Sequence, residues 1–283
     1  MSVESESQTA RARLIAQFFH LEKLPMLARA GLRAADLLEI SARIADASPE
    51  ALREQRELLE REAATCADEL LADAEFAAGV RRLPFRHGDV IVAVGDSITD
   101  DATSWAHILD RVLATAVPGV VVRNHGITGN TTGEVLHRLD LIARERPNWV
   151  IQMIGTNDAR RHGALRTMTT SPQETARNLG VLARFVRVEL AARHVVMTPP
   201  PTIDEWVTQW APFDVEAITW YAEDVQVIAD LVLAESAEAI DLHAAFRRAA
   251  ETTLLLPDGV HPNAVGQRLI VRTLVDSLNS IHP

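Results

Sequence analysis

The stretch from residue 90 to residue 99 reads VIVAVGDSIT, and it decides the fold class. Its first five residues are apolar and mostly β-branched, which is typical of a strand that is buried on both faces of a sheet. From Asp100 to Ala116 the apolar residues recur at helical spacing; they are Trp105, Ile108, Leu109, Val112 and Leu113. We therefore predict that Ser97 lies on a turn between the carboxyl end of a strand and the amino end of a helix.

Ser97 has two interpretations at this position. Backbone N–H groups at the amino end of a helix are unpaired and the helix dipole is positive there, so the turn suits an oxyanion. Ser97 is then either a nucleophile that uses this environment or the N-cap of the helix. Position alone favours the N-cap, because serine is one of the preferred N-cap residues.

A second motif, DGVHPN at residues 258–263, precedes a predicted helix over 264–278. A serine nucleophile needs a base to take its proton, and the base needs an acid that holds its ring in the correct tautomer. Asp258 and His261 can supply both groups from one turn of chain. The alternative is a helix-capping loop that carries a surface histidine.

Two more predicted strands, at 120–123 and 149–154, end in small and amide residues. The loops that follow read NHGITGNTT at 124–132 and GTND at 155–158. In open α/β sheets, ligands bind beyond the carboxyl ends of the strands.

These loops contain two candidate hydrogen-bond donors. Gly126 offers a backbone N–H and Asn157 offers a side-chain amide. Together with the N–H of Ser97 they make three donors for one developing oxyanion. The alternative is plain turn chemistry, because glycine and asparagine are common in loops.

In chain order, the four segments are 95–99, 124–132, 155–158 and 258–263. They resemble the sequence blocks of the SGNH (GDSL-type) hydrolase/esterase family, and the resemblance covers about the last two thirds of the chain. The resemblance implies that Ser97, Asp258 and His261 form a catalytic triad. It also implies an oxyanion hole made by Ser97, Gly126 and Asn157, and hydrolysis of esters. Four blocks in register outweigh the N-cap interpretation, so we predict that Ser97 is a nucleophile.

Other chemistries fit the residues poorly. The nucleophile elbow of α/β-hydrolases needs glycine two residues after the serine, where this chain has Thr99. A P-loop needs Gly-Lys-Ser/Thr, which does not occur. Phosphoryl transfer through Asp96 would use a second carboxylate two residues on, where Ile98 stands. The histidines lack the His-x-x-x-His spacing of a zinc helix, so we expect no metal and no cofactor.

Composition limits the partners and the compartment. The chain has 39 acidic and 28 basic residues and a net charge of −11, which disfavours nucleic acid and anionic membrane surfaces as partners. Cys66 is the only cysteine, so no intrachain disulfide is expected. No apolar run is long enough to span a membrane, and the first residues lack the features of a signal peptide. We therefore expect a cytoplasmic protein.

The 283 residues suit one large domain or two modest ones. We predict an all-helical N-terminal extension over residues 1–84, a hairpin or small bundle, and a hydrolase domain over 85–283. Ser48 and Pro49 mark the start of a helix that runs to about residue 78. This extension has two interpretations. It packs on the hydrolase domain, or it is a module through which the chain forms a homo-oligomer or binds a partner. The apolar seam of its long helix contains Leu52, Leu59, Ala63, Cys66 and Leu70.

Strands and helices alternate through the predicted hydrolase domain. This alternation predicts a parallel sheet with helices on both faces, which is a three-layer α/β/α architecture. The resemblance implies five strands in flavodoxin-like order, with Ser97 at the topological switch point. The strands are expected near 89–94, 120–123, 149–154, 193–198 and 238–242, and the helices between them near 100–116, 131–145, 171–192 and 213–235.

The loop after the fourth predicted strand is rich in aromatic residues. These side chains can wall an acyl pocket or stack on a sugar ring, or they can simply pin the insertion to the protein. For Arg160, the alternative to a substrate contact is a solvated surface position. The candidate substrate contacts are Asp96, His125, Arg160, Trp206 and Trp210.

The expected substrates are acetyl or short-chain esters of small molecules or carbohydrates. A lysophospholipase or thioesterase of the same family is the alternative enzyme. A non-catalytic binding protein on the same fold is the alternative from another class.

Overall fold

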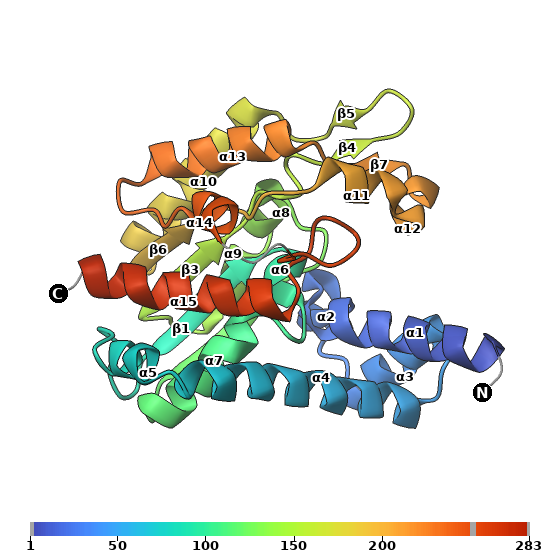
Figure 1. The fold of residues 1–283 in the computed structure, drawn as a ribbon, viewed down its shortest axis with the longest axis horizontal. Helices are drawn as coiled ribbons and strands as arrows, with labels where there is room; N and C mark the ends of the chain where they lie inside the picture. Colours follow the sequence, from blue (N-terminus) through green and yellow to red (C-terminus); the bar gives the residue numbers. More distant parts are fainter. Residues whose placement is uncertain (1–2, 250–252, 282–283) are drawn as a thin grey trace.

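A parallel sheet lies at the centre of the computed structural model, which describes residues 3–249 and 253–281 (Figure 1). The four strands follow the order β2-β1-β3-β6, and every neighbouring pair is parallel. The connections from β1 and from β2 lead to opposite sides of β1, so the carboxyl end of β1 is the switch point of the sheet. The strands are β1 (Val90–Gly95), β2 (Val121–Gly126), β3 (Trp149–Met153) and β6 (Arg193–Met197).

Both faces of the sheet are buried. In β1, Ile91 and Ala93 belong to one apolar cluster, whereas Val92 and Val94 belong to a second cluster on the opposite face. Burial on both faces explains why the sequence shows a continuous apolar run here instead of an alternating pattern. The predicted α/β class with a parallel sheet is confirmed.

Helices cover the two faces of the sheet. Helices α4, α5, α7 and α15 pack on the face that contains Ile91, and helices α8, α9, α10 and α13 pack on the face that contains Val92. Their bounds are α4 (Pro49–Leu71), α5 (Ala74–Arg81), α7 (Trp105–Ala116), α8 (Thr132–Leu136), α9 (Leu139–Arg144), α10 (Pro172–Arg184), α13 (Ala222–Glu235) and α15 (Ala264–Ile281).

The expected fifth strand over 238–242 does not form, so the prediction of five strands is wrong for the described residues. Only Ile240 bridges to β6: its N–H donates to the carbonyl of Val196, and its carbonyl accepts from the N–H of Thr198. The next residue, Asp241, already caps helix α14 (Leu242–Arg248) by accepting from the N–H of Ala244. The chain therefore leaves the sheet after one residue. The position of Ile240 beyond β6 still matches the flavodoxin-like order.

Several predicted helices are shorter or divided. The helix expected over 100–116 consists of a short α6 (Ser97–Asp100) and of α7, which begins at Trp105. The helix expected over 131–145 is split into α8 and α9, and α10 continues as a π-helix, η2 (Phe185–Glu189).

A small antiparallel sheet and two short helices were not predicted. The sheet has the order β5-β4-β7, and Figure 1 shows it next to α11 and α12. Its strands have two residues each, which is too short for a recognisable hydrophobic period. The bounds are β4 (Arg161–His162), β5 (Thr167–Met168), β7 (Ile218–Thr219), α11 (Asp204–Gln209) and α12 (Ala211–Val215).

The N-terminal part is helical, as predicted. Ser48 caps α4 by accepting from the N–H of Ala51 at 3.1 Å, and Pro49 is the first helical residue. The expected helix to residue 78 instead ends at Leu71, because Asp73 caps α5 through the N–H groups of the following turn. The remaining elements are α1 (Val3–Phe18), the 3-10 turn η1 (Leu21–Lys23), α2 (Pro25–Ala30) and α3 (Ala34–Ala45).

The long helix α4 belongs to two apolar clusters. Leu52 and Leu59 pack with Ala16 of α1 and Ala42 of α3 in a small cluster of the extension. The next two turns of the same seam enter the cluster that also contains β1, α7 and α15; these residues are Ala63, Cys66, Ala67 and Leu70. The extension therefore shares the main core, and the domain boundary near residue 84 stays a prediction.

None of the helices in the described part of the chain is both long enough and apolar enough to cross a membrane.

Candidate active site

Ser97 is the first residue of α6, and one residue, Asp96, separates it from the end of β1. The N-cap of this helix is Asp96, whose side chain accepts from the N–H of Ile98 at 3.0 Å. The hydroxyl of Ser97 instead lies 2.8 Å from Nε2 of His261. The capping role that position alone favoured for Ser97 thus belongs to its neighbour, and the serine hydroxyl is left to the histidine.

His261 is held by the loop before α15. Its Nδ1 lies 2.7 Å from Oδ2 of Asp258. The other carboxylate oxygen, Oδ1, accepts from the N–H groups of Val260 and His261 at 2.8 and 2.9 Å. One aspartate therefore shapes the turn and orients the imidazole, which is what a serine–histidine pair needs from a third group.

The electrostatics of the pair favour a protonated imidazole. Burial alone would lower the pKa of His261, but the hydrogen bond to Asp258 and the negative charges of Asp258, Asp101 and Asp96 raise it above its ordinary value. Burial alone would raise the pKa of Asp258, yet the hydrogen bond and the charge of His261 bring it below its ordinary value. Asp258 therefore stays ionised and stabilises the imidazolium.

Two of the three expected oxyanion donors still have a proton to give. Among the residues that the structure describes, the N–H of Ser97 has no hydrogen-bond partner. The amide Nδ2 of Asn157 donates to the carbonyl of Asn130 at 3.1 Å, and an amide nitrogen has a second proton to give. Nη1 of Arg160 donates to the Asn157 Oδ1 at 3.3 Å, so Nδ2 is the side that remains for an anion.

Gly126 has a different environment from the one expected. Its N–H donates to Oδ1 of Asn124 at 2.8 Å, so this donor is already engaged. A Cβ at residue 126 would collide with the backbone nitrogen of Asp100, because α6 crosses the end of β2 at close range. In the structure this glycine allows close packing of α6 on β2.

Gly129 is the second glycine of the same loop, and it precedes Asn130, whose carbonyl accepts from Nδ2 of Asn157. It has a φ of +83°, and the nearest heavy atom to a Cβ built there is Nη1 of Arg160, at 3.9 Å. Within the described ranges its N–H has no partner. One signal could have pointed to Gly129. It lies in the turn between Thr128 and Asn130, where a left-handed backbone favours glycine, whereas Gly126 is the last residue of β2.

The loop that carries Asn157 is fixed from behind by two buried groups. The indole N–H of Trp220 donates to the carbonyl of Thr156 at 2.9 Å. The Asp158 carboxylate accepts from Thr132 and from Thr175. Trp220 thus joins the aromatic segment to the site by supporting the backbone, which sequence reasoning did not assign.

The candidate substrate contacts separate into two groups. Arg160 touches Asn157, and Trp206 lies behind the triad loop, next to Gly259. His125 instead pairs with Glu145 at 3.1 Å. Trp210 joins α11 to α12 through local backbone hydrogen bonds.

Asp96, also a candidate, is only 1 % exposed. Its Oδ2 has no hydrogen-bond partner within the described part of the chain. Burial raises the pKa of this carboxyl to about 6.

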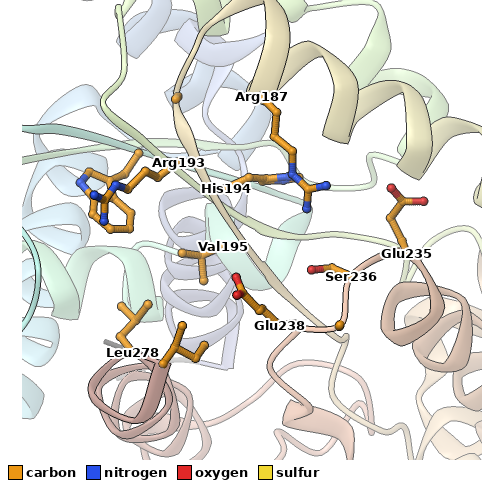
Figure 2. Close-up of a pocket in the computed structure, with 12 residues that line it drawn as sticks. Arg187, Arg193, His194, Val195, Glu235, Ser236, Glu238 and Leu278 are labelled. Atoms are coloured by element: carbon orange, nitrogen blue, oxygen red, sulfur yellow. The ribbon is translucent and has the colours of Figure 1, made fainter. Parts of the chain in front are cut away.

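A surface cavity of about 680 Å³ lies away from these residues, at the amino ends of β3 and β6. Figure 2 shows Arg193 and His194 on one side of it and Glu235, Ser236 and Glu238 on the other. None of the candidate site residues lines it. Because ligands of open α/β sheets bind at the carboxyl ends of the strands, the Ser97 edge is the candidate active site.

Sequence comparison identifies one family. A model of the GDSL-like lipase/acylhydrolase family matches residues 93–269, a span that includes Ser97, Asn157, Asp258 and His261. Helices α1 to α5 lie outside this span. None of the curated proteins compared with the chain matches it.

Solved structures share the fold. The α/β hydrolase LAE5 from the metagenome of Lake Arreo, Spain, is 24 % identical, with a TM-score of 0.56; the match covers 69 % of this chain and 97 % of that one. A variant of Axe2, an acetyl xylan esterase from Geobacillus stearothermophilus, is 23 % identical, with a TM-score of 0.55 and coverage of 69 % and 96 %. About three tenths of this chain therefore has no counterpart in either structure.

Proposed function

The chain belongs to the GDSL-like lipase/acylhydrolase family and is a hydrolase of ester bonds, and on this premise we propose that it removes acetyl or other short-chain acyl groups with Ser97 as nucleophile. The observation that carries the proposal is the line of two hydrogen bonds from Ser97 through His261 to Asp258, at 2.8 and 2.7 Å. Neither a binding protein nor a structural protein needs this arrangement.

In the proposed mechanism, Nε2 of His261 takes the hydroxyl proton while Oγ of Ser97 attacks the ester carbonyl. The tetrahedral intermediate collapses when His261 returns the proton to the leaving alcohol, and the acyl group stays on Ser97. Water then repeats the sequence on the acyl-enzyme, with His261 again as base, and releases the acid. Asp258 holds the ring and balances the charge of the imidazolium throughout.

We further propose that the oxyanion is bound by the N–H of Ser97, the N–H of Gly129 and Nδ2 of Asn157. Gly129 replaces Gly126 in this proposal because the N–H of Gly126 already donates to Asn124. The first two groups have no partner within the described residues, and the third retains a proton. Preorganised donors of this kind stabilise the transition state because they need no reorientation when charge develops.

The pH dependence follows from the raised pKa of His261. The base must be neutral, so kcat/KM is expected to fall as the pH drops through this pKa, which lies above the ordinary value of 6.5. Asp258 has a lowered pKa and stays ionised over the same range, so it adds no acid limb of its own. A profile of kcat/KM from pH 5 to pH 9 measures the fall. An acid limb centred below pH 6.5 would contradict the assignment of the base.

Acyl length tests the substrate class. Ser97 is 7 % exposed and Asn157 is 3 % exposed, so little surface is open around the reacting atoms, which favours small acyl groups. The fold shared with an acetyl xylan esterase supports the same choice. On a series of 4-nitrophenyl esters, kcat/KM is expected to be highest for acetate or butyrate and to decrease toward decanoate.

Two other results have a defined meaning. A rate that rises with acyl length would instead favour the lysophospholipase or thioesterase alternative. A protein that hydrolyses no ester, and whose Ser97 takes no label from a fluorophosphonate, would be a binding protein on this fold.

A further inference from the structure

The end of α1 and the turn η1 lie against the elements that carry the candidate site. Specific contacts join the end of α1 to the residues that follow α6. The backbone carbonyl of Gln17 accepts from the N–H of Ala102 at 3.0 Å. The side-chain Nε2 of Gln17 donates to Oδ2 of Asp101 at 2.9 Å. Both Asp101 and Ala102 directly follow the helix that begins with Ser97.

A buried carboxylate links the extension to two parts of the site. Oδ1 of Asp100 contacts Nδ1 of His20 at 2.9 Å and Nζ of Lys23 at 2.7 Å. Oδ2 of the same group accepts from the N–H and the hydroxyl of Thr128, both at 2.9 Å. Asp100 is the last residue of the serine helix, and Thr128 precedes Gly129. One side chain therefore connects the extension, the nucleophile helix and the oxyanion loop.

This anchorage places Phe18 on the histidine. The ring centroids of Phe18 and His261 are 4.8 Å apart and the rings are inclined by 47°. The two hydrogen bonds of His261 hold its ring at Nδ1 and Nε2. Phe18 adds a third contact, in which the two rings pack at an inclined angle. Only 14 % of the His261 side chain is exposed.

We propose that Phe18 is a positioning residue for the reaction: its ring keeps the imidazole of His261 in line with Ser97. The proposal rests on the proposed function, in which His261 is the base. A histidine that is free to tilt spends less time at hydrogen-bond distance from the hydroxyl, and small displacements of a reacting group are costly. The family match covers residues 93–269, so Phe18 lies in a part of the chain outside the match.

Point variants of the full chain are the appropriate test. Removal of the extension would also remove Ala63, Cys66 and Leu70 from the main core, so a truncated protein could lose activity by unfolding. Phe18→Ala removes the ring, Phe18→Leu keeps an apolar side chain without it, and Phe18→Tyr restores it. Phe19→Ala is the matched control, because Phe19 is the next residue, is also half-buried, and has no ring contact within the described residues.

Four quantities are measured for each variant: kcat and KM on 4-nitrophenyl acetate, the second-order rate of Ser97 labelling by a fluorophosphonate, and the melting temperature. Phe18→Ala is expected to lower kcat by about 10- to 100-fold, with KM little changed and the labelling rate reduced by a similar factor. Phe18→Leu is expected to recover part of the loss, Phe18→Tyr most of it, and Phe19→Ala should match the unmodified protein.

Three results would overturn the positioning role of Phe18. The first is an unchanged kcat with an unchanged KM in Phe18→Ala, and the second is a change confined to KM. The third is an equal loss in Phe18→Ala and Phe19→Ala that follows the melting temperature. In each case the unmodified protein still hydrolyses the ester, so the proposed function stands. An unmodified protein that neither hydrolyses the ester nor takes the label overturns both proposals.

Discussion

Replacement of Ser97 by alanine is expected to lower kcat for ester hydrolysis by roughly 10⁴- to 10⁶-fold, because loss of a nucleophile disables the triad as a unit. The remaining oxyanion donors can still polarise a bound carbonyl, so a small rate above that of water is expected. The fold should be unaffected, because Asp96 and not Ser97 caps α6. The measurement is kcat on 4-nitrophenyl acetate, together with the mass of the protein after treatment with a fluorophosphonate.

Ser236→Ala is a suitable control for this change. Ser236 lines the cavity of Figure 2 and takes no part in the proposed site. This variant should keep both the activity and the mass shift of the label, whereas Ser97→Ala should lose both. Full esterase activity in Ser97→Ala, or a label that still attaches to that protein at one site, would show that the nucleophile is another residue.

Asn157→Ala is expected to lower kcat by roughly 100- to 1000-fold, the usual cost of one oxyanion donor. The effect belongs in kcat and not in KM, because the donor binds the charged intermediate more strongly than the neutral ester. Asn157→Asp should be slower still, because it replaces a donor with a negative charge of similar shape. Steady-state kinetics on the same acetate ester measure both variants.

Asn279→Ala provides the comparison for this loss. The amide of Asn279 donates to the carbonyl of Gly79, between α15 and α5, so its removal can affect stability but not the proposed oxyanion hole. We expect its kcat to match that of the unmodified protein. If Asn157→Ala raised KM and left kcat unchanged, Asn157 would bind substrate in the ground state and the oxyanion assignment would be wrong.

The sheet could be predicted because its strands are continuous apolar runs. Residues 90–94 and 149–154 are buried on both faces, so the pattern is unambiguous. The segment 238–242 reads EAIDL and is no continuous apolar run; Asp241 caps a helix, and this capping residue ends the pairing after Ile240. Competition between pairing and capping is settled by the surrounding structure and not by local sequence.

Position at the end of a predicted strand or helix decided which contacts of the site were foreseeable. Ser97, Asn157 and His261 each follow or precede a predicted element, so the topology of a parallel sheet brings them to one edge. The choice between Gly126 and Gly129 depends on which N–H already has a partner, and the loop sequence does not specify that. Phe18 reaches His261 only through the packing of a helix from the far end of the chain, which no local pattern reports.

The divided seam of α4 has a consequence for synthesis on the ribosome. Its first turns can be covered early by α1 and α3, but Ala63, Cys66 and Leu70 pack with β1, α7 and α15, which emerge later. Arg268 of α15 also pairs with Glu69 of α4 at 2.6 Å. Nascent domains generally fold from the N-terminal side. Here, the second half of α4 can be covered by β1 and α7 only after residue 116 has been translated, and its cover is complete only when α15 has followed.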